Sequence, residues 1–229
     1  MGMRIHWYAV TGATVRVHCL TTGTPAPDGT EVRRQECLSA GELLGVDRYT
    51  FSSIPDSRFV EHRGSINADL FDVFHEARPD IVYTHYPDDQ HLDHSVTARE
   101  VTTVARREAR NLRHFRSPYS VGFEPNEFFF DTAELLEIKV RALECFASQT
   151  QLDMDVFRQL TKLAYRQHLH LHLHHNIVAS LPAKGKSHAR HLAQAAGSAR
   201  TLMFGLFEVA GVHRLIDGVP LCGVTDLHG

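Results

Sequence analysis

Short apolar segments alternate with longer amphipathic segments along the first two thirds of the chain, and this alternation constrains the fold more than any other feature. The segments predicted as strands are residues 14–20, 48–52, 81–84 and 126–131, and those predicted as helices are residues 31–44, 68–77, 95–110, 132–146 and 151–165. Strands that alternate with helices predict an α/β fold, a Rossmann-like three-layer α/β/α architecture with a mainly parallel sheet. In such sheets, ligands bind beyond the carboxyl ends of the strands.

The composition excludes several classes of function. With 229 residues and a formal net charge of −3, the chain suits one buried domain, and it gives no electrostatic case for binding nucleic acid or an anionic membrane. Four widely separated cysteines predict reduced thiols rather than a disulfide framework or a zinc knuckle. We find no apolar run of about 18 residues and no signal peptide, so we expect a cytoplasmic protein.

Histidines and carboxylates gather directly after the third predicted strand. Residues 85–94 contain His85, Asp88, Asp89, His91, Asp93 and His94. Imidazole nitrogens and carboxylate oxygens are the usual ligands of catalytic zinc, and a carboxylate beside the metal can take up a proton or orient a histidine. The plainer alternative is a solvated loop in which Asp93 caps the following helix. The spacing alone leaves both interpretations open.

Several motifs follow one another in a recognisable order. Asp89-Gln-His91-Leu-Asp93-His94 has the pattern D-x-H-x-D-H at the start of a predicted helix. Residues 15–23 form a strand ending in Thr-x-Gly, residues 33–46 read R-x-E…A…LG, residues 79–85 lead into the histidine motif, and residues 126–149 close with a Ser-Gln pair. Over about residues 1–150, this ordered set resembles the LmbE-like/PIG-L family of metal-dependent N-deacetylases.

The resemblance implies an activity and a set of site residues. The activity is zinc-dependent removal of an N-acetyl group from a small-molecule conjugate of the amino-sugar type. His94 would be a ligand of Zn²⁺, His91 would stabilise the tetrahedral intermediate or protonate the leaving amine, and Asp93 would orient His91. Asp89 is expected to shape the substrate pocket. Arg34 would contact a polar or anionic part of the substrate, although an exposed helix arginine is the plainer alternative.

The first signature of the family, A-H-P-D-D-E, does not occur in the 229 residues. In the family it precedes the strand that corresponds to residues 14–20, and its histidine and second aspartate are two of the three protein ligands of zinc. The resemblance therefore implies an incomplete zinc site in this chain. It also implies a missing first strand, whose neighbours would be left with unpaired edges. We expect that the true start lies upstream or that the reading frame is truncated.

The last third of the chain has a different character. Histidines alternate with leucines from residue 168 to 174, and only three acidic residues occur after residue 166. We therefore predict a deacetylase-like domain over residues 1–165 and an atypical His-rich tail of uncertain order over residues 166–229, either frameshifted or a genuine extension. Two other functions stay open: a family-derived binding domain without chemistry, and a histidine-rich protein that stores or senses metal.

Overall fold

The computed structural model describes residues 1–22, 29–117, 119–124, 127–128, 132–150, 177–180 and 200–204. The helices in this part of the chain are α1 (Gly2–Val10), α2 (Gly29–Leu44), α3 (Arg63–Ala77), α4 (Leu92–Glu108) and α5 (Ala133–Glu144). The strands are β1 (Thr14–Cys19), β2 (Arg48–Phe51), β3 (Ile81–His85), β4 (Asn111–Phe115), β5 (Glu127–Phe128), β6 (Ile177–Ser180) and β7 (Arg200–Phe204).

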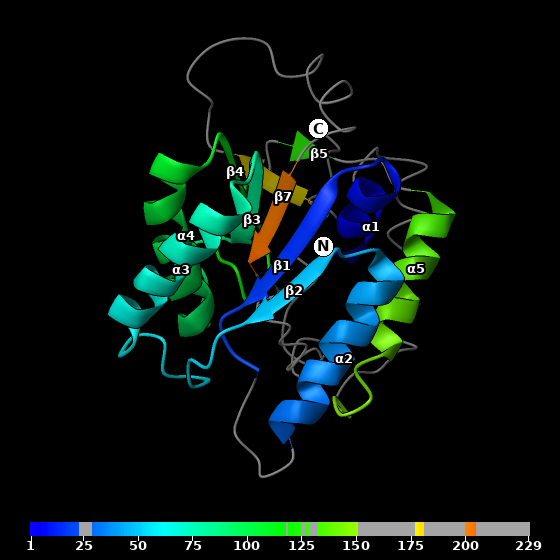
Figure 1. The fold of residues 1–229 in the computed structure, drawn as a ribbon, viewed down its shortest axis with the longest axis horizontal. Helices are drawn as coiled ribbons and strands as arrows, with labels where there is room; N and C mark the ends of the chain where they lie inside the picture. The colour runs from blue at the N-terminus through cyan, green and yellow to red at the C-terminus, as the bar shows by residue number, and fades with distance from the viewer. Residues whose placement is uncertain are drawn as a thin grey trace, which may run out of the picture.

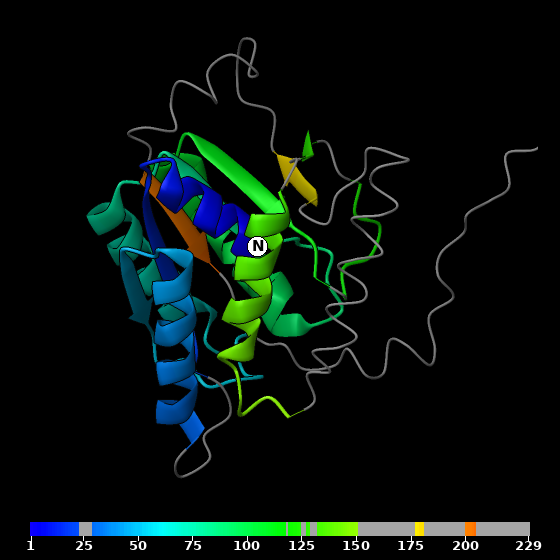
Figure 2. The same ribbon diagram turned by 90° about the vertical axis from the view of Figure 1, so that its right-hand side faces the viewer.

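All of these strands belong to one sheet in the order β2-β1-β7-β3-β4-β6-β5. The pairs from β2 to β4 are parallel, and β6 pairs antiparallel with both β4 and β5. Figure 1 shows α3 and α4 on one side of the sheet and α1, α2 and α5 on the other. In the turned view of Figure 2, α2 and α5 run side by side. The predicted three-layer α/β/α architecture with a mainly parallel sheet is confirmed.

Each face of the sheet has its own hydrophobic core. Val15, Val17 and Tyr83 pack with residues of α1, α2 and α5. Val82, the neighbour of Tyr83 along β3, packs instead with residues of α3 and α4 such as Leu70. This alternation follows from the period of two in a strand, and β3 is buried along its whole length because helices cover both faces of the sheet.

An interior strand of the sheet, β7, comes from the tail of the chain. β7 pairs with β1 from Thr14↔Arg200 to His18↔Phe204, and it pairs with β3 from Ile81↔Thr201 to Tyr83↔Met203. In Figure 1, β7 lies between β1 and β3. The backbone edges that a missing first strand would leave open are therefore paired here. The predicted boundary at residue 165 and the predicted helix over residues 151–165 lie outside the described residues.

The remaining predicted elements differ from the structure mainly at their ends. α3 begins at Arg63 instead of residue 68. α4 begins at Leu92 with His91 as its N-cap, so the alternative in which Asp93 caps this helix is wrong. β4 was not predicted, because the polar residues Arg113 and His114 interrupt its apolar pattern. No described helix has the length and apolar character needed to cross a bilayer.

We predict that Leu202→Pro strongly destabilises the fold. Residue 202 of β7 lies opposite Arg16 of β1 and Val82 of β3. Proline has no N–H to donate in the middle of a sheet, so the free energy of unfolding in urea should fall by at least about 3 kcal/mol. Leu202→Val keeps the N–H and is the matched control. If the proline variant unfolded at the same urea concentration as this control, β7 would not be a central strand.

Candidate active site

The histidine motif lies where β3 ends and α4 begins, at the carboxyl edge of the parallel strands. His85 is the last residue of β3, and His91 and His94 lie at the first turn of α4. Asp89, in the connection, shapes the start of the helix because its Oδ1 accepts a hydrogen bond from the backbone N–H of His91 (2.9 Å). The position agrees with the expectation that chemistry in this fold class sits beyond the strand ends.

Three imidazole rings are stacked at this point. The ring of His94 lies against that of His85, with centroids 4.1 Å apart and planes 7° apart. The His94 ring also lies against the ring of His91, with centroids 4.4 Å apart and planes 25° apart. The side chains of His85 and His94 are almost fully buried, and His91 is half-buried. The stack fixes the plane of the His94 ring, and it brings together both histidines that the resemblance singled out.

Asp89 fixes the rotation of the same ring. Its carboxylate accepts hydrogen bonds from His94 Nδ1 (3.2 Å), from Ser120 Oγ (2.8 Å) and from the hydroxyl of Ser117. Burial by itself would raise the pKa of Asp89, but these hydrogen bonds and the one from the His91 N–H outweigh burial and lower it. Asp89, expected to shape the substrate pocket, therefore lies behind His94 as an ionised acceptor.

One nitrogen of the stack is left for a ligand. With His94 Nδ1 donating to Asp89, the lone pair lies on His94 Nε2, which is buried and has no hydrogen-bond partner among the described residues. A histidine held by a carboxylate at one nitrogen and unpaired at the other is the usual arrangement of a zinc ligand. Within the described residues, however, no group of three His, Cys, Asp or Glu side chains could hold a metal ion. The described residues therefore supply one ligand of a zinc site, His94, and not a complete site.

Asp93 binds the backbone of the segment before α3. Its Oδ2 accepts a hydrogen bond from the backbone N–H of Ser57 (2.6 Å), and its Oδ1 accepts one from Phe59 (3.2 Å). Burial raises the pKa of Asp93, against the lowering effect of both hydrogen bonds and of nearby His91. That His91 affects this pKa is consistent with the predicted pairing of Asp93 with His91, which stays a prediction.

Arg34 lies on α2, where its side chain is exposed and its guanidinium sits 5.0 Å from the ring centroid of Phe51. Its role in binding substrate stays a prediction. The neighbouring arginine of the same motif is involved in packing: Arg33 pairs with Glu36 (3.3 Å), and Glu36 accepts hydrogen bonds from both the N–H and the hydroxyl of Ser148. Two motifs of the resemblance that lie far apart in the sequence therefore meet between α2 and α5.

Three residues of the site carried no sequence signal. The hydroxyls of Ser117 and Ser120 contact Asp89 from the segment after β4, and the ring of His114 on β4 donates from Nδ1 to the carbonyl oxygen of His85 (2.7 Å). His114 belongs to β4, a strand that the sequence does not predict, and Ser117 and Ser120 follow this strand. Their alignment with β3 through the parallel pairing of β3 and β4 is what brings them to the site.

Comparison with known proteins agrees with the motif order. Residues 1–105 match the sequence model of the family described as PIG-L, GlcNAc-PI de-N-acetylase. A zinc-inhibited form of the teicoplanin deacetylase Orf2 superposes with a TM-score of 0.67 at 16% identity, over 82% of this chain and 94% of that one. The N,N'-diacetylchitobiose deacetylase of Pyrococcus horikoshii gives 0.63 at 20% identity, over 80% and 78%. A 4-carboxy-2-hydroxymuconate hydratase, GalB from Pseudomonas putida KT2440, gives 0.66 at 18% identity, over 82% and 92%. These structures share the fold.

We predict that Asp89→Asn destabilises the protein in a pH-dependent way. The variant loses charged acceptors for buried donors, which should lower the free energy of unfolding by about 2 kcal/mol at neutral pH. Because the folded pKa of Asp89 is lowered, its contribution is complete above the unfolded pKa of about 4 and is lost as the pH falls below it. As the pH falls below about 4, the difference between the two proteins in urea titrations should therefore shrink steadily, while Asp88→Asn, at an exposed position, stays close to wild type throughout. A pH-independent difference would contradict the assignment.

We also predict that His85 makes the protein sensitive to mild acid. Burial, with a smaller contribution from neighbouring His94, lowers the pKa of His85 well below its usual range, so the folded protein keeps this ring neutral. Between about pH 7 and pH 5, the unfolded chain takes up a proton that the folded protein refuses, and stability falls. His85→Phe should reduce this pH dependence by about one proton, and His75→Gln on the exposed face of α3 should not. Equal slopes in all three proteins would show that His85 is not buried as a neutral ring.

Proposed function

We infer from residues 1–105, which belong to the PIG-L family of GlcNAc-PI de-N-acetylases, that this protein is a deacetylase. We propose that it removes an N-acetyl group from a small-molecule conjugate of the amino-sugar type, with zinc as its cofactor. The observation that carries the proposal is the Nε2 of His94, which is buried at the carboxyl edge of the sheet and has no hydrogen-bond partner in the described part of the chain. The structures with the same fold include a teicoplanin deacetylase and an N,N'-diacetylchitobiose deacetylase, which supports this class of reaction and substrate.

Each residue of the site has a role in this proposal. His94 would hold the metal through Nε2, and Asp89 would keep the ring turned toward it. When bound by a complete ligand set, zinc supplies a Lewis acid and lowers the pKa of its water toward neutrality. His91, half-buried and stacked on His94, is placed to hold a proton close to the amide that is cleaved. The remaining ligands would have to come from outside the described residues.

A second function follows from the same incompleteness. The described residues supply only one metal ligand. A family member that has lost its chemistry but keeps the fold as a binding domain would show the same arrangement. Small-molecule binding fits either function, and the net charge of −3 favours neither nucleic acid nor an anionic membrane as a partner. The cytoplasm is the location that we propose for both.

Zinc content and acetate release test the proposed function. Purified wild-type protein, dialysed against zinc-containing buffer, should retain about one zinc ion per chain and release acetate from an N-acetylglucosamine conjugate. His94→Ala should lose the zinc because it removes a ligand. His91→Ala should keep the zinc and lower kcat by about 100-fold or more, as expected for a lost proton-transfer group. His75→Ala, at an exposed position of α3, is the control.

The two functions predict different results for the wild-type protein. A folded wild type that retains no zinc and releases no acetate would contradict the deacetylase and leave the binding domain. Zinc that is retained equally by wild type and His94→Ala would show that the metal is held elsewhere in the chain.

A further inference from the structure

Two buried carboxylates of α4 contact α3 and the loop that leads into it. Asp93 and Glu100 are seven residues apart, so they lie on one side of the helix, and both side chains are almost fully buried. Glu100 holds the beginning of α3, since it accepts hydrogen bonds from Arg63 Nε (2.7 Å) and Asn67 Nδ2 (3.0 Å). Two helical turns nearer the start of α4, Asp93 holds the loop that leads into α3.

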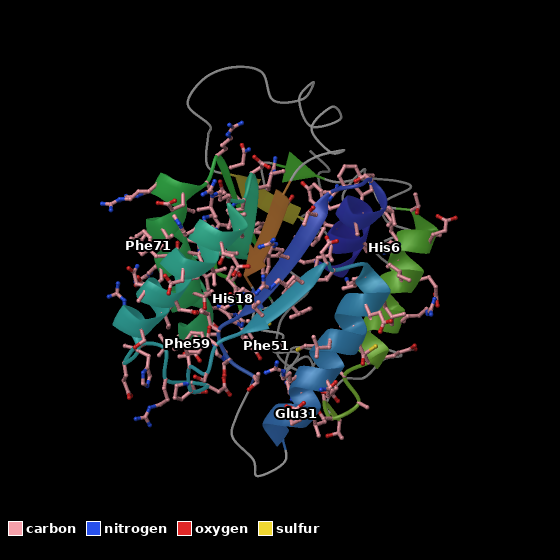
Figure 3. The ribbon with its side chains drawn as sticks, viewed as in Figure 1. His6, His18, Glu31, Phe51, Phe59 and Phe71 are labelled. Carbon is pink, nitrogen blue, oxygen red and sulfur yellow. The ribbon has the colours of Figure 1, made fainter. Side chains whose placement is uncertain are left out.

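The contact of Asp93 with this loop is bidentate. Its two oxygens accept hydrogen bonds from the backbone N–H groups of Ser57 and Phe59, so both are used by the same bend of the chain. Ser57 has a φ of 61°, a left-handed conformation that a serine adopts only when its surroundings hold it. Phe59 is fully buried in the core under α3 and α4, on the side of the molecule where Figure 3 labels it.

The other end of the loop is fixed at Ser52. Its N–H donates to the carbonyl oxygen of Cys19 (2.8 Å), and its hydroxyl donates to Asp69, which also accepts a hydrogen bond from the buried ring of His18 (2.9 Å). Ser52 and Asp69 contact the same nitrogen of His18, Nε2, so this cluster lacks the geometry of a nucleophilic triad. It ties the loop to β1 and α3. Between Ser52 and the bend at residues 57–59, the chain is held at both ends.

We propose that Asp93 is a positioning residue of the loop between β2 and α3: its carboxylate holds the Ser57–Phe59 bend against the first turn of α4, and the loop thereby becomes a fixed wall beside His91 and His94. This differs from the role that the resemblance implies, in which Asp93 orients His91. That the wall faces a substrate rests on the proposed function, whereas the contact itself is independent of it.

Hydrogen exchange of the loop tests the positioning role without any activity. Asp93→Asn replaces one acceptor with an NH₂ group that faces a backbone N–H, so the amides of residues 55–62 should exchange at least about ten-fold faster than in wild type. Peptides from α5 should exchange as in wild type, which separates a local effect from a general loss of stability. Asp88→Asn removes a carboxylate from an exposed position of the same connection and is the matched control.

A second variant approaches the contact from the loop. Ser57→Pro removes the N–H that binds Asp93 and cannot adopt a φ of 61°, so it should also speed up exchange over residues 58–62 while leaving α4 unaltered. Ser57→Ala keeps the N–H and should exchange like wild type. This pair keeps the test informative if Asp93→Asn does not fold. Exchange over residues 55–62 that matches wild type in both Asp93→Asn and Ser57→Pro would overturn the proposal.

Kinetics separate the positioning role from a role at His91. In a protein that releases acetate, a loosened wall should raise KM more than it lowers kcat, whereas a misoriented His91 would lower kcat at unchanged KM. A fall in kcat alone for Asp93→Asn would therefore also overturn the proposal. A wild-type protein without any acetate release bears only on the proposed function, because the exchange result stands without it.

Discussion

The structure depends on the pairing of β7 between β1 and β3. β3 is buried on both faces, and Val15 of β1 is fully covered, as are Val82 and Tyr83 of β3. Backbone N–H and C=O groups at such buried positions need a partner strand. β7 supplies it on both sides, and it does so in parallel, which keeps the carboxyl ends of β1 and β3 at one edge. Without it, the sheet would divide into two halves with facing open edges. The relative position of every residue at the carboxyl edge follows from this pairing.

The candidate site divides its two aspartates between two tasks. Asp89 lies in the connection and faces inward, where it orients the His94 ring that the stack with His85 and His91 has already fixed in its plane. Asp93, four residues later in the first turn of α4, binds the loop between β2 and α3. A single short motif therefore both prepares a nitrogen for a ligand and ties in the neighbouring loop. This explains in physical terms why the motif places carboxylates on both sides of its first histidine.

What could be predicted from the sequence was mostly local. The apolar runs at residues 14–20 and 81–84 predicted β1 and β3, and the position of the histidine motif after a strand predicted the edge at which the site lies. The order of the motifs predicted the fold family, and the contact of Glu36 with Ser148 shows how two of them meet. The predicted start of α4, Ser95, lies three residues after the observed start at Leu92.

What could not be predicted depends on contacts between distant parts of the chain. β4 has the polar residues Arg113 and His114 at buried positions, so its pattern is not that of a buried strand. β7 belongs to a tail whose composition gave no sign of a central strand, and only pairing with β1 and β3 defines it. The partners of Asp93 are backbone N–H groups more than thirty residues away, and a backbone donor leaves no trace in the sequence.

The central claim is that His94 presents Nε2 to a metal at the carboxyl edge of the sheet. X-ray absorption at the zinc edge of the metal-loaded protein measures this directly, since an imidazole nitrogen lies about 2.0–2.1 Å from zinc. The account predicts that the wild-type spectrum contains imidazole scattering at that distance and that His94→Gln loses one imidazole from it. Identical spectra for the two proteins, or a wild-type spectrum with hydrated zinc alone, would contradict the account.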